Sequence, residues 1–185
     1  MRLIPYFLIG FRFFLGIAII LNARTKFVRK AFLPLLVFGV FTDYIDGIFC
    51  RLLGGGYPLS INVWDGYADI SIFVSGTYFI FNNYWEILKK YKYALSALIA
   101  LQLMSWGFSL VKFGRMTTYH SYGAKLWSVI MLLSMIEIVN FKKSRLLPFM
   151  LLIGILSNIE EIGITHTLLH WKNNVPSLYH AIHMK

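Results

Sequence analysis

Long apolar segments are the feature that most limits how this chain can fold. Six stretches of about 20 mostly apolar residues follow one another along the 185 residues, and a helix of that length crosses the hydrocarbon core of a bilayer. This length and pattern predict a single domain, residues 1–185, that is an all-α integral membrane protein built as a six-transmembrane-helix bundle. The expected helices are Leu3–Asn22, Ala31–Leu53, Ile61–Asn82, Tyr93–Val111, Leu126–Asn140 and Leu146–Leu169.

The composition agrees with a membrane location. Hydrophobic residues make up 58% of the chain and charged residues 14%, whereas soluble domains contain roughly 25% charged residues. The net charge of +10 comes from short Lys and Arg clusters between apolar segments, a pattern that favours anionic lipid headgroups and phosphate-bearing substrates over nucleic acid. A single cysteine, Cys50, excludes an internal disulfide. The first apolar stretch contains Arg12 and no small-residue cleavage site, so we expect a retained helix and not a signal peptide.

Four aspartates stand out because carboxylates are unfavourable inside a membrane. Asp43 and Asp46 lie near the end of the second segment, and Asp65 and Asp69 lie near the start of the third. The glycine-rich hinge at 54–58 makes these two helices antiparallel neighbours, so we expect all four acids at one depth. Each ionised carboxylate costs about 2.5–3.5 kcal/mol in a membrane helix, and divalent cations relieve both this cost and the mutual repulsion. Oxygen ligands suit Mg²⁺ or Mn²⁺; the alternative for any single acid is a buried Arg or Lys partner.

Two neighbouring residues narrow the chemistry. Gly47 directly follows Asp46 and leaves the helix face open to a ligand, and Arg51 is placed to meet phosphate oxygens. Paired metals, an arginine and a spare carboxylate together are suited to phosphoryl-type transfer.

The stretches "DYIDGIFCR" and "INVWDGYAD" resemble the signature of the CDP-alcohol phosphotransferase family. Cys50 and Ile61 stand where the family has alanine and glycine, and the spacing from Arg51 to Asp65 is one residue longer. The opening "IPYFLIGFR" also resembles the family's IPN-x-x-T-x-x-R pattern, with Arg12 in register. The signature positions that match are Asp43, Asp46, Gly47, Arg51, Asp65 and Asp69.

The resemblance implies an enzyme of phospholipid synthesis. It would transfer a phosphatidyl group from CDP-diacylglycerol to the hydroxyl of a small alcohol and release CMP. Gly47 and Arg51 would contact the CDP moiety, and Asp69 would also be the general base. The family is usually homodimeric. The implied ligands of two Mg²⁺ or Mn²⁺ ions are Asp43, Asp46, Asp65 and Asp69.

Basic residues between the fourth and fifth segments are candidates for binding the acceptor. Lys112, Arg115, His120 and Lys125 could hold an anionic alcohol such as glycerol 3-phosphate or an inositol phosphate. The alternative is an interfacial loop whose cations reach lipid headgroups.

Two pairs of polar residues in or next to the sixth segment need partners. Glu160 and Glu161 are expected to pair with Arg12 or another buried cation, or else to line a polar cavity. His166 and His170 are spaced i, i+4, and we expect an interfacial pair near the helix end instead of a zinc site.

Two considerations give opposite orientations of the chain across the membrane. Lys and Arg are most numerous near the first, third and fifth connections, which would place these in the cytoplasm and both termini outside. Because cytidine nucleotides are supplied in the cytoplasm, we instead place the aspartates on the cytoplasmic face of a bacterial inner membrane. Two other functions stay open: a non-catalytic relative, suggested by Ile61, and a membrane cation transporter that uses the aspartates.

Overall fold

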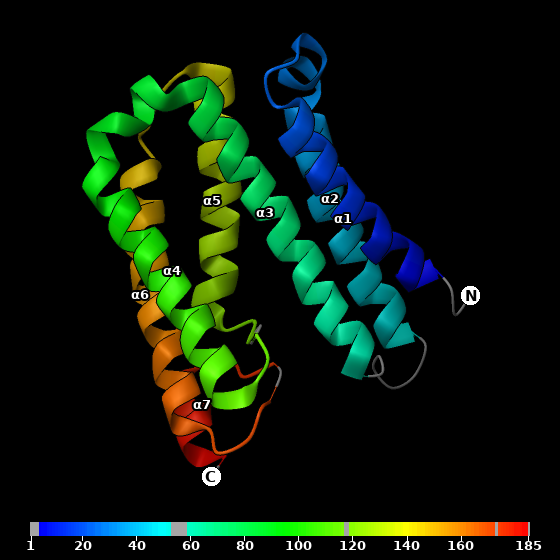
Figure 1. The fold of residues 1–185 in the computed structure, drawn as a ribbon, viewed down its shortest axis with the longest axis vertical. Coiled ribbons are helices and arrows are strands. Elements are labelled where there is room, and N and C mark those ends of the chain that lie inside the picture. The colour runs from blue at the N-terminus through cyan, green and yellow to red at the C-terminus, as the bar shows by residue number, and fades with distance from the viewer. Residues whose placement is uncertain (1–3, 53–58, 117–118, 173, 185) are drawn as a thin grey trace. The chain divides into compact units, whose positions relative to one another are not determined.

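The computed structural model describes the chain except for residues 1–3, 53–58, 117–118, 173 and 185, and side chains within 4–5, 43–44, 46–52 and 59–63 are likewise outside the description. All regular structure in the described part is helical, which confirms the predicted all-α class (Figure 1). The elements are α1 (Ile4–Asn22), α2 (Lys26–Leu52), α3 (Leu59–Leu88), η1 (Lys89–Tyr91), α4 (Lys92–Phe113), α5 (Tyr122–Phe141), α6 (Leu147–Thr167) and α7 (Leu178–His183).

The helices α1 to α6 correspond one to one with the six expected apolar segments. The largest differences are that α3 ends at Leu88 instead of Asn82 and that α2 begins at Lys26 instead of Ala31. Thr25 explains this earlier start, because its Oγ1 accepts a hydrogen bond from the Val28 backbone N–H at 3.3 Å and so caps the first turn. The glycine-rich hinge at 54–58 lies outside the described residues.

The described helices form two compact units, Met1–Trp85 and Glu86–Lys185. The division falls near Tyr84, whose φ of −134° and ψ of 27° interrupt the helical path of α3. The single domain expected from the sequence stays a prediction, and each unit is described by itself.

In the first unit, α2 runs antiparallel to both α1 and α3 (Figure 1). Two contacts fix the register of α2 against α3. The rings of Phe32 and Phe79 stack with centroids 3.8 Å apart, and a β-carbon on Gly39 would lie 3.0 Å from Ile72 Cδ1. Both pairs fit one antiparallel register, so the register holds for at least two helical turns.

In the second unit, α6 packs against both α4 and α5. Gly154 permits the closest approach, since a β-carbon there would lie 2.5 Å from Trp127 Nε1 and 2.9 Å from Leu98 Cδ1. The chain beyond α6 turns back to cover one end of this unit, where Tyr119 and Val175 are buried together with residues of α6 and α7.

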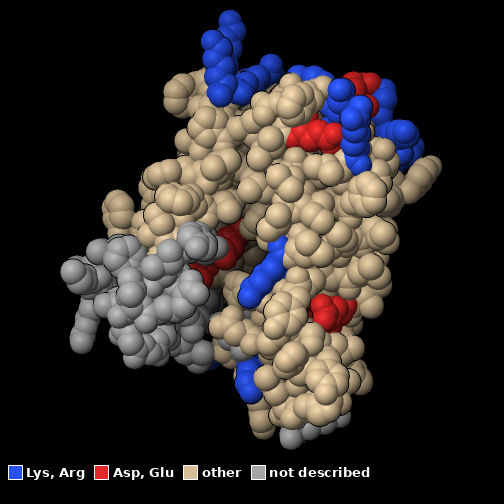
Figure 2. All heavy atoms as spheres, turned by 180° about the vertical axis from the view of Figure 1, so that it is seen from behind, with Lys and Arg blue, Asp and Glu red and all other residues tan. Residues whose placement is uncertain are grey.

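Three described stretches are long and apolar enough to cross a membrane: Trp64–Phe113, Tyr122–Phe141 and Leu147–Thr167. Large apolar side chains also point outward, including Leu21 and Val111, which are 77% and 88% exposed. Figure 2 shows one face on which residues other than Lys, Arg, Asp and Glu cover most of the described surface. These features are consistent with a helical membrane protein, whose outer surface meets lipid instead of water.

Candidate functional site

Arg12 of α1 bridges two aspartates of α3. Its Nη2 donates to Asp65 Oδ1 at 2.5 Å, and its Nη1 donates to Asp69 Oδ1. The Arg12 side chain is fully buried, whereas the side chains of Asp65 and Asp69 are 22% and 21% exposed. Because residues i and i+4 share one face of a helix, a single guanidinium can contact both acids. We call these three residues the Arg12 cluster.

A close approach of α1 to α3 sets the position of Arg12. Gly16 lies one turn beyond Arg12 and directly against Ser71, and a β-carbon at residue 16 would come within 2.9 Å of the Ser71 carbonyl oxygen. The Ser71 hydroxyl donates to the Phe13 carbonyl at 3.4 Å. On the other side of Arg12, Ile9 packs on Ala68. Contacts above and below Arg12 therefore hold α1 at the level of the two acids.

The backbone of α2 carries Asp43 and Asp46 in its last turns, beside the first turns of α3 (Figure 1). When the Phe32–Phe79 and Gly39–Ile72 register is continued, Asp46 is level with Asp65. The two helices are thus antiparallel neighbours, as expected. The side chains of Asp43, Asp46, Gly47 and Arg51 lie outside the described residues, so their roles stay predictions.

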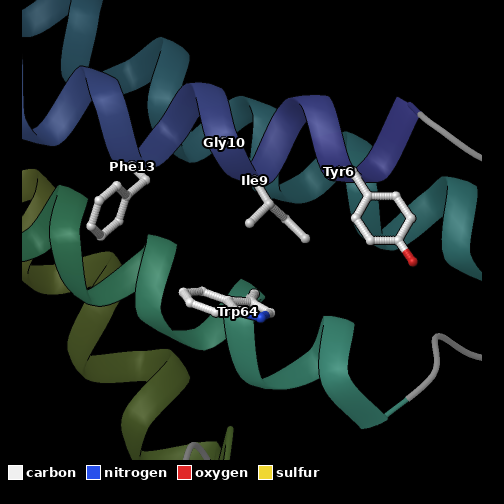
Figure 3. Close-up of a pocket in the computed structure, with 5 residues that line it drawn as sticks. All are labelled: Tyr6, Ile9, Gly10, Phe13 and Trp64. Carbon is white, nitrogen blue, oxygen red and sulfur yellow. The ribbon is translucent and has the colours of Figure 1, made fainter.

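An apolar groove of about 350 Å³ adjoins the Arg12 cluster. Figure 3 shows Tyr6, Ile9 and Phe13 extending from α1 toward Trp64 on α3. Gly10 completes the lining. Phe13 directly follows Arg12 and Trp64 directly precedes Asp65, so residues that line the groove are sequence neighbours of the Arg12 cluster on both helices.

The donor chemistry of the Arg12 cluster fits a divalent cation. Two carboxylates face one guanidinium, which leaves a net charge of −1, and hard oxygen donors are the ligands that Mg²⁺ and Mn²⁺ prefer. Within the described part of the chain no group of three His, Cys, Asp or Glu side chains could hold a metal. A complete two-metal cage therefore requires ligands from α2, and it stays a prediction.

The four basic acceptor candidates belong to the second unit. Lys112 Nζ donates to the carbonyls of Thr165 and His166, each at 2.8 Å, and so caps the last turn of α6. Arg115 and Lys125 are exposed, and His120 is partly buried with a φ of 50°. Lys112 thus has a structural role that the sequence did not indicate, and the acceptor role of all four residues stays a prediction.

Glu160 and Glu161, which were expected to pair with Arg12 or another buried cation or else to line a polar cavity, have hydrogen-bond partners within the second unit. Glu160 Oε1 accepts from the Leu178 backbone N–H at 3.3 Å, and Glu161 Oε2 accepts from the Ser105 hydroxyl at 3.2 Å. Arg12 instead contacts the aspartates of α3.

The two histidines near the end of α6 do not share a helix face. His166 is exposed in the last turn of α6, whereas His170 lies beyond the helix end at Thr167. An i, i+4 ligand pair on one helix is therefore absent here.

Arg12 was not among the site residues expected from the sequence. A signal was available, because an arginine in the middle of an apolar segment must find an anionic partner or a polar cavity. The identity of that partner depended on how α1 packs. Comparison of the chain with known protein families, with characterised proteins and with solved structures gives no match.

Proposed function

We propose that this protein is a metal-dependent CDP-alcohol phosphotransferase that moves the phosphatidyl group of CDP-diacylglycerol to the hydroxyl of a small polar alcohol. The observation that carries the proposal is that α1 and α3 together carry both the Arg12 cluster and an apolar groove. An amphiphilic substrate needs such an arrangement, with charged groups for its phosphates and an apolar surface for its hydrocarbon chains. The match of six signature positions between Asp43 and Asp69 gives the substrate class.

The proposed reaction is a substitution at phosphorus. The acceptor hydroxyl oxygen attacks the β-phosphorus of CDP-diacylglycerol, the bond from that phosphorus to the bridging oxygen breaks, and CMP leaves with the bridging oxygen. The hydroxyl proton passes to Asp69. Gly47 and Arg51 would bind the CDP moiety, and Asp43, Asp46, Asp65 and Asp69 would hold the metals. Bound Mg²⁺ or Mn²⁺ would neutralise the diphosphate and stabilise charge that develops during transfer.

Six membrane spans follow if the longest apolar stretch is divided. Trp64–Phe113 contains 50 residues, and as one helix it would measure about 75 Å, more than twice the roughly 30 Å hydrocarbon core. The kink at Tyr84 and the 3₁₀ turn Lys89–Tyr91 interrupt it, and Glu86 and Lys92 add charge there. We therefore assign α3 and α4 to separate spans, with α1, α2, α5 and α6 as the other four.

The proposed location is a bacterial inner membrane, with the Arg12 cluster on the cytoplasmic side where cytidine nucleotides are supplied. The acceptor is proposed to meet Arg115, His120 and Lys125. A homodimer is proposed from the family resemblance.

Release of CMP tests the function. Purified protein in nanodiscs is incubated with Mn²⁺, CDP-diacylglycerol and a panel of polyols and polyol phosphates, and we expect CMP release with at least one acceptor. Asp69→Asn should abolish release while nucleotide binding persists. No release with any acceptor would contradict the enzyme and favour a non-catalytic relative, whereas Mn²⁺ flux into liposomes without CMP release would favour a cation transporter.

A further inference from the structure

We propose that Arg12 exchanges partners during substrate binding: it donates to Asp65 and Asp69, and it moves to a substrate phosphate when a divalent cation takes those carboxylates. This inference rests on the proposed function and assigns a role to a residue outside the metal and CDP sets expected from the sequence.

The first argument is competition for oxygen atoms. Arg12 donates to Oδ1 of both Asp65 and Asp69. A cation that bound these same oxygens would lie next to a fully buried guanidinium, and two positive charges a few ångströms apart in a site with little water repel strongly. Binding of metal alone is therefore weakened by Arg12.

The second argument is the chemical similarity of the two partners. The guanidinium group binds carboxylate and phosphate oxygens with the same paired N–H geometry. A diphosphate bound at the metals would bring new oxygens to the guanidinium released from the aspartates. Arg12 would then favour the metal and the diphosphate together over the metal alone.

The third argument concerns Asp69. In this structure the Oδ1 atom of Asp69 accepts from Arg12, so that oxygen is engaged by a cationic donor. A general base needs a free lone pair directed at the acceptor hydroxyl. Exchange of Arg12 to the phosphate would remove this cationic donor from Asp69 after CDP-diacylglycerol has bound, so that the carboxylate oxygen not taken by the metal could accept the proton of the acceptor hydroxyl.

The fourth argument is that contacts on either side of Arg12 hold α1 in place. Helix α1 is held by Gly16 against Ser71 and by Ile9 against Ala68, on either side of Arg12. The proposed exchange is therefore a movement of the arginine side chain toward the exposed side of Asp65 and Asp69, with the backbone of α1 held.

The experiment measures two affinities in the full-length protein in nanodiscs. Mn²⁺ binding is followed by electron paramagnetic resonance without nucleotide, and CDP binding is followed by calorimetry at saturating Mn²⁺. The variants are Arg12→Gln, Arg12→Lys and the control Arg24→Gln, which removes an exposed arginine of the same unit that bonds Asn82. Only variants with a single cooperative melting transition are compared.

We expect Arg12→Gln to bind Mn²⁺ alone about tenfold more tightly than wild type and CDP about tenfold more weakly. Arg12→Lys keeps the charge and should bind Mn²⁺ like wild type, while its CDP affinity falls because the paired N–H geometry is lost. Arg24→Gln should change neither affinity.

An unchanged or weaker Mn²⁺ affinity in Arg12→Gln would overturn the exchange and leave Arg12 as a fixed structural partner. If Arg12→Gln does not fold, an unchanged CDP affinity in Arg12→Lys overturns it instead. CMP release by the wild type is scored separately. If the wild type releases CMP but the Arg12 variants keep the wild-type affinities for Mn²⁺ and CDP, only the exchange of partners is contradicted. If the affinities change as expected but no CMP is released, only the transferase function is contradicted.

Discussion

Gly16 of α1 lies so close to Ser71 of α3 that a β-carbon at residue 16 would come within 2.9 Å of the Ser71 carbonyl oxygen. A carbonyl oxygen within a helix cannot move without the backbone, so a larger residue would push α1 away from α3. Because Arg12 lies one turn from Gly16, this contact also sets the distance from Arg12 to its aspartates.

We therefore expect Gly16→Ala to lower the free energy of unfolding by about 1–3 kcal/mol, the usual effect of overpacking. Thermal unfolding in detergent measures the change. Gly10→Ala is the matched control on the same helix, since a β-carbon there meets nothing within 4 Å. Equal stability of the two variants would contradict the close contact.

Gly154 offers a second packing test, in the other unit. Gly154→Ala should displace the Trp127 indole and break its hydrogen bond to Met150 Sδ at 3.4 Å, with a loss of about 1–3 kcal/mol. Gly107→Ala is the control, because a β-carbon at residue 107 has open space around it. Intrinsic tryptophan fluorescence should shift in Gly154→Ala only. A fluorescence change of the same size in both variants would argue against this packing.

Removal of one acid from the Arg12 cluster should be more harmful to stability than its partial exposure suggests. Asp65→Leu removes one of the two acids that the described residues place against the buried guanidinium, and removing a partner from a buried pair typically costs about 3–5 kcal/mol. The double variant Arg12→Met with Asp65→Leu should recover part of this loss. Denaturant unfolding measures the free energy of unfolding of both variants. A double variant less stable than Asp65→Leu would disprove the energetic coupling between Arg12 and Asp65.

Lys112 is expected to stabilise α6 and not to bind the acceptor. Lys112→Met removes two hydrogen bonds from a charged donor to the Thr165 and His166 carbonyls, and we expect a stability loss of about 1.5–3 kcal/mol with an unchanged KM for the acceptor. Arg115→Gln, at an exposed position, should instead raise that KM without a change in melting temperature. A raised KM in Lys112→Met at unchanged stability would restore its acceptor role.

Six spans with a cytoplasmic Arg12 cluster place the C-terminus in the cytoplasm. A reporter fused after the last residue should therefore be active only in the cytoplasm. In a Cys50→Ala background, a cysteine at position 143 in the α5–α6 connection should be labelled from outside by an impermeant maleimide. A C-terminus outside the cell would disprove this orientation and agree with the Lys and Arg distribution.

The sequence predicted the positions of the long helices because apolar length alone requires them. It missed α7, a helix of six residues whose start is set by Ser177 Oγ accepting from the His180 backbone N–H. Six residues are too few for a periodic pattern to be recognised.

The sequence could not predict which groups the charged side chains Arg12 and Lys112 would contact. Arg12 was one of the partners considered for Glu160 and Glu161, and the structure shows it bonded to Asp65 and Asp69. All four acids are equally suitable in chemistry, and only the packing of α1 on α3 selects between them. The same limit applies to Lys112, whose carbonyl partners lie 53 and 54 residues away in the chain.

The antiparallel register of α2 and α3 also bears on how the chain tolerates changes in length. Phe32 on Phe79 and Gly39 on Ile72 anchor this register from the side away from the hinge. A residue added within 54–58 leaves those anchors untouched, so the longer Arg51-to-Asp65 spacing need not move Asp65 relative to Asp46. A residue added between Asp69 and Ile72 would turn both α3 aspartates about 100° away from Arg12. We therefore expect an insertion within 54–58 to preserve the Arg12 cluster, and an insertion between Asp69 and Ile72 to disrupt it.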